Sequence, residues 1–90
     1  MADDVSEKIN QLKIMSDNVN ELIQQQYSQE NVDLTKINEL MALYFKYQEQ
    51  IFIMYATATD NEEFTSEMYN AADFYNDAKW DAYKNTGKYF

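Results

Sequence analysis

The chain has 90 residues, a length that supports one small domain with a modest core and not two domains. It contains neither histidine nor cysteine, and its formal net charge is −9. These features exclude thiolate metal sites and the usual general base near neutral pH. They also disfavour binding to a nucleic-acid backbone, which requires a basic protein surface.

Proline is absent and glycine occurs once, so turns are few and long uninterrupted helices are the expected structure. The most apolar stretch, residues 40–58, is broken by Lys46, Gln48, Glu49 and Gln50 and predicts no membrane span. The first residues, MADDVSEK, lack the basic start and apolar run of a secretory leader. We therefore expect a cytoplasmic protein that does not engage a membrane.

The first helix is predicted at about residues 3–26. Asp3 and Asp4 are placed to cap its start, and Glu7 suits its first turn. Met15 and Leu22 widen an apolar stripe that indicates one buried face. That stripe steps by four and three residues through Val5, Ile9, Leu12, Ser16, Val19 and Ile23, with the serine in an otherwise apolar position.

The segment SQENVD, residues 28–33, breaks the pattern, and Asn31, Asp33 and Thr35 are alternative caps for the helix that follows. This second helix is predicted at about residues 34–57. It is apolar around most of its circumference, which places it between the other helices or at a self-association interface. The apolar residues on these sides include Leu34, Ile37, Leu40, Met41, Tyr44, Phe45, Tyr47, Ile51, Phe52, Ile53, Met54 and Tyr55.

The third helix is predicted at about residues 61–85, after the break TATDNEE. Thr59 with Glu62, or Asp60 with Glu63, has the spacing of a capping box. Gly87 is expected to stop the helix, with Tyr89 and Phe90 packing back onto the domain. Its predicted seam is Phe64, Met68, Ala71, Tyr75, Ala78 and Ala82.

Three helices with short connections predict an all-α fold, a small antiparallel three-helix bundle forming a single domain over residues 1–90. The alternative is a long helical hairpin that completes its core by oligomerising, since the second helix is apolar on several sides.

No residue pattern predicts catalysis, a metal or a cofactor. The four serines, at positions 6, 16, 28 and 66, lie in no recognisable nucleophile motif. A di-iron helical site uses Glu-x-x-His pairs, which a histidine-free chain lacks. One glycine cannot build a phosphate-binding loop. We therefore expect a protein that is not an enzyme.

The third helix carries the most distinctive surface. Between residues 60 and 81 the chain has seven acidic residues against one base, Lys79. At about 100° per residue, most of these acids fall within about 140° of arc. Phe74 points into that arc and Trp80 lies at its edge, while Tyr69 and Tyr83 are expected on an adjoining face. The predicted partner-binding residues are Glu62, Glu63, Glu67, Asp73, Phe74, Asp77, Trp80 and Asp81.

This surface predicts a non-catalytic protein–protein interaction module, a small acidic helical binder or inhibitor. Its expected partner is a basic surface of another protein, such as a nucleic-acid-binding site, because spaced carboxylates can imitate phosphates. Direct nucleic-acid binding is not expected. The composition is similar to that of small phage proteins that inhibit CRISPR or restriction nucleases, although no shared motif supports the comparison.

Two alternatives stay open on the sequence alone. In the first, the acidic surface is simply solvated and its aromatics fold back over the helix ends. In the second, the chain is an assembly subunit or small chaperone of a secretion-type apparatus. The apolar second helix, residues 34–57, favours this second alternative because it could support self-association.

Overall fold

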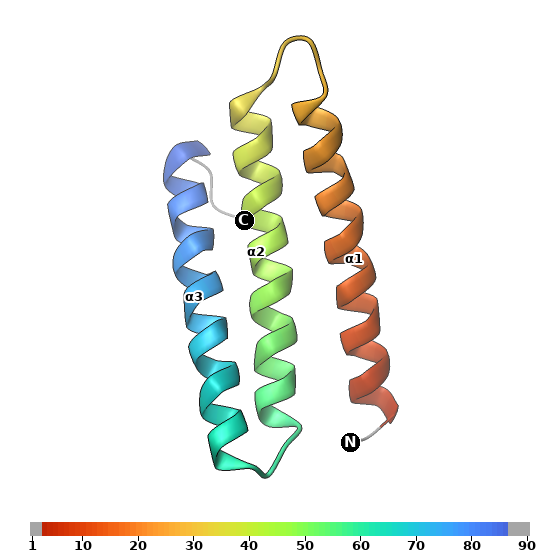
Figure 1. Ribbon diagram of the computed structural model, residues 1–90, viewed down its shortest axis with the longest axis vertical. Helices are drawn as coiled ribbons and strands as arrows, with labels where there is room; N and C mark the ends of the chain where they lie inside the picture. The colour runs from red at the N-terminus through yellow and green to blue at the C-terminus, as the bar shows by residue number, and fades with distance from the viewer. Residues whose placement is uncertain (1–2, 87–90) are drawn as a thin grey trace.

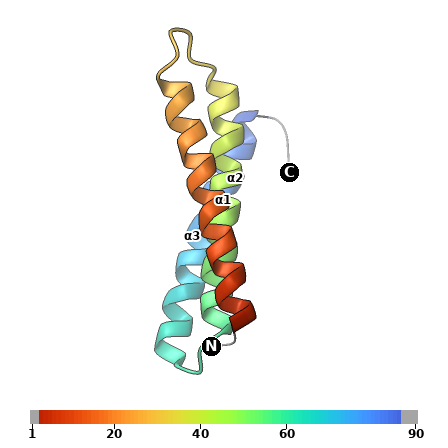
Figure 2. The same cartoon turned by 90° about the vertical axis from the view of Figure 1, so that its right-hand side faces the viewer.

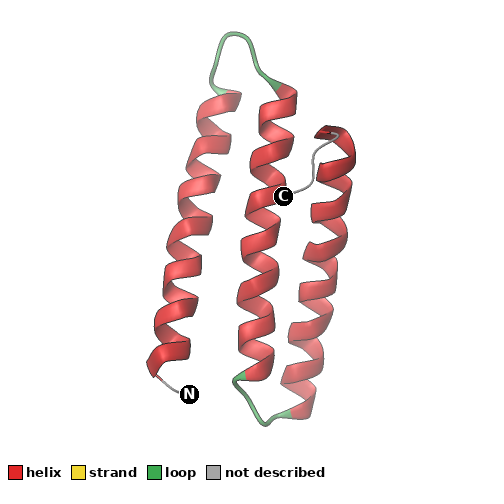
Figure 3. Cartoon of the chain, turned by 180° about the vertical axis from the view of Figure 1, so that it is seen from behind, coloured by secondary structure: helices red, strands yellow, loops and turns green. Residues whose placement is uncertain are grey.

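The computed structural model describes residues 3–86 and consists of three α-helices in up-down-up order (Figure 1). Helix α1 spans Asp3–Tyr27, α2 spans Leu34–Thr57 and α3 spans Glu62–Thr86. No strand occurs in this part of the chain, as Figure 3 shows. The predicted all-α three-helix bundle is confirmed, and the chain does not adopt the two-helix hairpin.

Helix α2 lies between the other two. It packs against α1 on one side and α3 on the other, whereas α1 and α3 make no backbone contact within residues 3–86 (Figures 1 and 2). The particle is elongated, with extents of 48 × 24 × 18 Å. Because the outer helices do not meet, each is an edge helix, and the apolar circumference of α2 is explained by two separate neighbours.

Capping residues set the helix starts. Asp33 is the N-cap of α2, since its carboxylate accepts a hydrogen bond from the Lys36 backbone N–H at 3.1 Å. Helix α1 begins at Asp3, so Asp3 and Asp4 lie in its first turn, and the predicted capping by these residues stays a prediction. The predicted stop at Gly87 and the packing of Tyr89 and Phe90 lie outside the described residues.

Neither predicted capping box begins α3. Asn61 is the cap, because its side-chain oxygen accepts from the Phe64 N–H at 3.0 Å. The Thr59 hydroxyl accepts instead from the Asn61 N–H at 3.2 Å, which tightens the turn before the helix. An amide oxygen at position 61 reaches the third helical residue from directly before the helix, so the helix starts at Glu62, one residue later than predicted.

The α1–α2 interface follows the predicted stripe, except that Met15 and Leu22, which were expected to widen it, are exposed. Ile9, Val19 and Ile23 are buried, and the last two form a cluster with Leu40. Ser16 is also buried, and its hydroxyl accepts a hydrogen bond of 2.6 Å from the Gln48 side-chain amide. The one polar position in the stripe is therefore satisfied across the interface.

The α2–α3 interface follows the predicted seam in part, since the seam residue Ala82 is buried. Its buried cluster contains Ala42, Ala82 and Tyr83, although Tyr83 was expected on an adjoining face. Ala42 is fully buried and small enough to leave room for the Tyr83 ring, so α3 turns this residue toward α2. Phe64, predicted to lie in the seam, is 39% exposed.

Candidate partner-binding surface on the third helix

The predicted site residues all lie in α3, and each of their side chains is exposed. The six acids run from the first turn of the helix to its last third, and Phe74 and Trp80 lie among the later ones. Burying a carboxylate without a partner is costly, so the acids stay on the side of α3 that does not pack on α2. The exposed residues are Glu62, Glu63, Glu67, Asp73, Phe74, Asp77, Trp80 and Asp81.

Lys79, the one base in the acidic segment, does not neutralise this surface. Its ammonium nitrogen lies 3.0 Å from Glu49 Oε1 in α2, and the two side chains are only 14% and 18% exposed. Lys84 is the other nearby base, at 3.8 Å from Asp81 in an exposed pair of the kind that contributes little. With Lys79 turned inward, the outer side of α3 keeps a strongly negative surface.

Phe74 and Trp80, the two aromatic residues of the surface, differ in their exposure and in their contacts. Phe74 is 65% exposed, and its ring meets Tyr75 edge-on with ring centroids 5.4 Å apart. Trp80 is 45% exposed and packs edge-on against Tyr83 at 5.3 Å, with the Lys79 ammonium 5.6 Å from its ring centroid. Phe74 is therefore the side chain that a partner can cover most completely, whereas Trp80 also holds the fold together.

Behind Phe74 lies a chain of aromatic contacts that the sequence reasoning missed. Tyr75 connects to Phe45 at 6.0 Å and stacks on Phe52 at 5.5 Å with an interplanar angle of 11°. Phe52 in turn contacts Tyr55 at 6.5 Å. The seven-residue spacing of the two phenylalanines in α2 is a signal that could have located this stack. It gives the backbone under Phe74 a rigid support.

The surroundings of Tyr44 change the acidity of its phenol. Burial raises the pKa of its phenol above the ordinary value of 10.0, and the neighbouring Tyr75 and Asp17 raise it further. Each of these effects disfavours the phenolate, because a buried negative charge is poorly solvated and is repelled by other negative charges. The Tyr44 phenol is therefore neutral at physiological pH.

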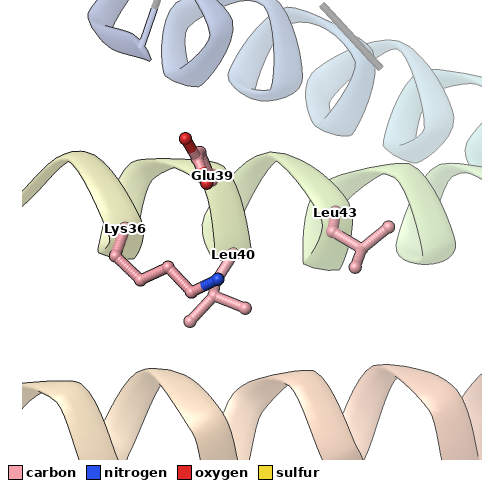
Figure 4. A pocket seen from close by; sticks show the side chains of 4 residues that line it. All are labelled: Lys36, Glu39, Leu40 and Leu43. Carbon is pink, nitrogen blue, oxygen red and sulfur yellow. The ribbon is translucent and has the colours of Figure 1, made fainter. Parts of the chain in front are cut away.

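A hollow of about 180 Å³ lies on α2, lined by Lys36, Glu39, Leu40 and Leu43 (Figure 4). Lys36 and Leu40 point toward α1 in this view, whereas Glu39 points to the other side. Pockets that enclose small ligands usually measure about 300–1,000 Å³. The hollow is smaller, lies away from the acidic surface of α3, and gives no support to a small-molecule site.

Further observations narrow what the surface can do. Within residues 3–86, no cluster of three or more carboxylates is arranged to hold a metal ion. None of the helices in this range is long and apolar enough to cross a membrane. Comparisons with protein-family models, curated proteins and solved structures find no match to this chain.

Proposed function

We propose that the protein is a non-catalytic interaction module that docks the exposed side of α3 on a basic surface of a partner protein. The observation that carries the proposal is the joint exposure of six acids and Phe74 on one helix, with Lys79 held inward by Glu49. Charge of one sign steers a partner of the opposite sign toward the surface, and an exposed aromatic ring supplies contact area once it arrives.

A sharper form of the proposal is an inhibitor that occupies a nucleic-acid-binding site, as phage inhibitors of CRISPR and restriction nucleases do. Asp73, Asp77 and Asp81 are spaced by four residues, which separates them by about 6 Å along the helix axis. Phosphates along one strand of a duplex are about 3.4 Å apart along its axis. The three carboxylates therefore form a row of negative charges, as the phosphates of a nucleic-acid strand do. Such a protein would act in the cytoplasm.

The alternative role as an assembly subunit or chaperone was predicted to use the second helix. In the structure, α1 and α3 cover two sides of α2, and Ile53, 38% exposed, is the most exposed large apolar residue of its interior. Self-association through α2 stays a prediction. Of the exposed large apolar residues, Ile14, Met15, Leu22 and Tyr27 lie on α1, and Leu34 and Ile53 lie on α2.

The direct test is affinity capture of partners from the native host with matched charge variants. Changing Asp73, Asp77 and Asp81 to lysine should abolish capture, and wild-type binding should weaken by about tenfold or more as salt rises to about 0.5 M. The control changes Asp17, Glu21 and Glu30 to lysine, which alters the net charge equally but leaves α3 intact. Partner retention by the α3 variant would disprove the proposal.

Phe74 provides a second test of the same surface. Replacing Phe74 with alanine should lower partner affinity by at least about 30-fold, the effect of losing an interface hot spot, with little change in the free energy of unfolding. Tyr69, 44% exposed on the same helix but outside the predicted site, is the matched control. Equal losses of affinity for the two variants would show that Phe74 has no special role.

A further inference from the structure

Helix α1 carries a second stripe on its solvent side, which we call the uncharged face of α1. The structure exposes all six of its side chains, including Ile14 at 60%, Met15 at 42% and Leu22 at 46%. The remaining members are neutral amides. The uncharged face consists of Gln11, Ile14, Met15, Asn18, Leu22 and Gln25.

The spacing of this face is that of a helix-packing seam. Gln11, Met15, Asn18, Leu22 and Gln25 step by four and three residues in alternation, like the buried stripe of the same helix. At about 100° per residue, the two stripes lie roughly 110° apart around α1. A helix with two such stripes suits two neighbours, but α2 is its one backbone neighbour among residues 3–86. The second stripe therefore lacks a helix to pack against.

The charge distribution indicates which helix fits. The chain carries a net charge of −9, yet this face has no charged residue for about four turns, and Glu7 and Asp4 end it toward the N-terminus. A basic partner would be attracted to the acids of α3 instead. A second copy of an acidic chain approaches with least repulsion where both surfaces are neutral. We infer that the uncharged face of α1 is the interface of a homodimer.

The face is also complementary to itself in the antiparallel direction. A two-fold axis at Asn18 would place Ile14 opposite Leu22 of the second copy and Gln11 opposite its Gln25. Each contact then occurs twice, and the central asparagine pair fixes the register, as a single buried asparagine does in coiled coils.

A parallel arrangement is less favourable. It would bring Asp4 and Glu7 of both copies side by side at the same end of the interface, where like charges repel. The antiparallel arrangement instead places these acids beyond the other copy's helix, which ends at Tyr27. We therefore assign the dimer an antiparallel register.

The interface is short. Its seam spans fourteen residue steps, or about 21 Å of helix. One pair of helices of this length buries less than the roughly 1,200 Å² of a standard interface, so the dissociation constant should be on the order of 10–100 µM. The dimer does not depend on the proposed binding function of α3, and the lysine variants of Asp73, Asp77 and Asp81 should still form it.

Cysteine cross-linking tests the register directly, because the chain has no cysteine of its own. On mild oxidation, Asn18→Cys should give a disulfide-linked dimer, with the apparent mass doubling from 10.7 kDa. Gln11→Cys should not, since the two cysteines would lie about 21 Å apart along the axis. Asn70→Cys, at an exposed asparagine of α3, is the control for random collision.

Light scattering of the cysteine-free protein tests the surface. Wild type should approach twice its monomer mass at about 0.5 mM, Leu22→Glu should remain monomeric, and Ile53→Glu on α2 should behave as wild type. A wild-type monomer at that concentration, or cross-linking of Asn18→Cys no faster than Asn70→Cys, would overturn the dimer. Equal cross-linking of Gln11→Cys would overturn the antiparallel register, and dimer loss in Ile53→Glu alone would move the interface to α2.

Discussion

The two sides of α2 pack against their neighbouring helices with different kinds of side chain. Toward α1 the interface is largely aliphatic, with Val19, Ile23 and Leu40 in one cluster and the buried Ser16–Gln48 hydrogen bond beside it. Toward α3 it combines small alanines with a buried tyrosine, stacked rings and an ion pair. The α2–α3 contact is also the more extensive of the two. Small residues allow helices to approach closely, and the aromatic rings fill the space around them.

This difference has a consequence for stability. Because α1 and α3 make no backbone contact, neither edge helix can compensate for a loss on the other side of α2. Damage to the alanine–tyrosine contact should therefore cost more than damage to any exposed residue of α3. A substitution in the α2–α3 interface leaves the side chains of the α1–α2 interface unchanged. The contribution of each interface to stability can therefore be tested separately.

Replacing Tyr83 with alanine should have the largest effect. Its side chain is 2% exposed, and removing a buried aromatic ring typically costs about 3–5 kcal/mol through lost burial and the cavity left behind. Urea unfolding followed by circular dichroism measures the change in the free energy of unfolding. If the alanine variant does not fold, Tyr83→Leu should show about half of the loss, because it keeps an apolar side chain in the space.

The matched control for Tyr83 is Tyr69, which is 44% exposed on the same helix. Tyr69→Ala should change the free energy of unfolding by less than about 1 kcal/mol, as surface substitutions usually do. Equal destabilisation by the two alanine variants would contradict the assignment of Tyr83 to the centre of the α2–α3 interface.

The two interfaces were also unequally predictable. The buried stripe of α1 was found from sequence because its aliphatic residues repeat at helical spacing, but the exposure of Met15 and Leu22 beside it was not. On α3 apolar residues point in several directions, and the face that packs is decided by Ala42, which lies on another helix. A single-helix pattern holds no information on that choice.

The candidate site could also be predicted only in part from the sequence. Exposure of the acids was predictable, since carboxylates rarely enter a core without a partner. The inward turn of Lys79 was not, because its partner Glu49 lies 30 positions earlier in the chain. Nor did the sequence separate the exposed Phe74 from the better supported Trp80, because that difference depends on contacts with Lys79 and Tyr83.

The Lys79–Glu49 pair should contribute a moderate, measurable coupling. Both side chains are mostly buried at the α2–α3 interface, so the pair is less screened than a surface pair. A double-mutant cycle with Lys79→Met and Glu49→Gln should give a coupling free energy of about 1–2 kcal/mol. Urea unfolding of the four proteins measures it.

The comparison pair for that cycle is Lys84 and Asp81, whose side chains are 72% and 77% exposed. Their coupling should not exceed about 0.5 kcal/mol, because water and salt screen exposed charges. If the exposed pair coupled as strongly as the interhelical one, the ion pair could not be counted among the features that distinguish the α2–α3 side.

Substitution of Tyr44 should have the smallest effect. The Tyr44 phenol interacts with residues from the helices on both sides of α2. Its pKa is raised first by burial, then by Tyr75 of α3 and last by Asp17 of α1. A phenol whose folded pKa exceeds its unfolded value stabilises the fold fully below pH 10.0, and this contribution is lost as the pH rises through the folded pKa. Tyr44→Phe should therefore move alkaline unfolding to higher pH.

The order of these causes predicts how the two neighbours rank. In a titration of tyrosine absorbance, the step that disappears in Tyr44→Phe belongs to the Tyr44 phenol. It should move down more in Tyr75→Phe than in Asp17→Asn, because Tyr75 is the larger of the two electrostatic causes. Tyr69→Phe, which removes an exposed phenol, should leave that step in place. A larger shift in Asp17→Asn would mean that α1, and not α3, dominates the electrostatic environment of the central helix.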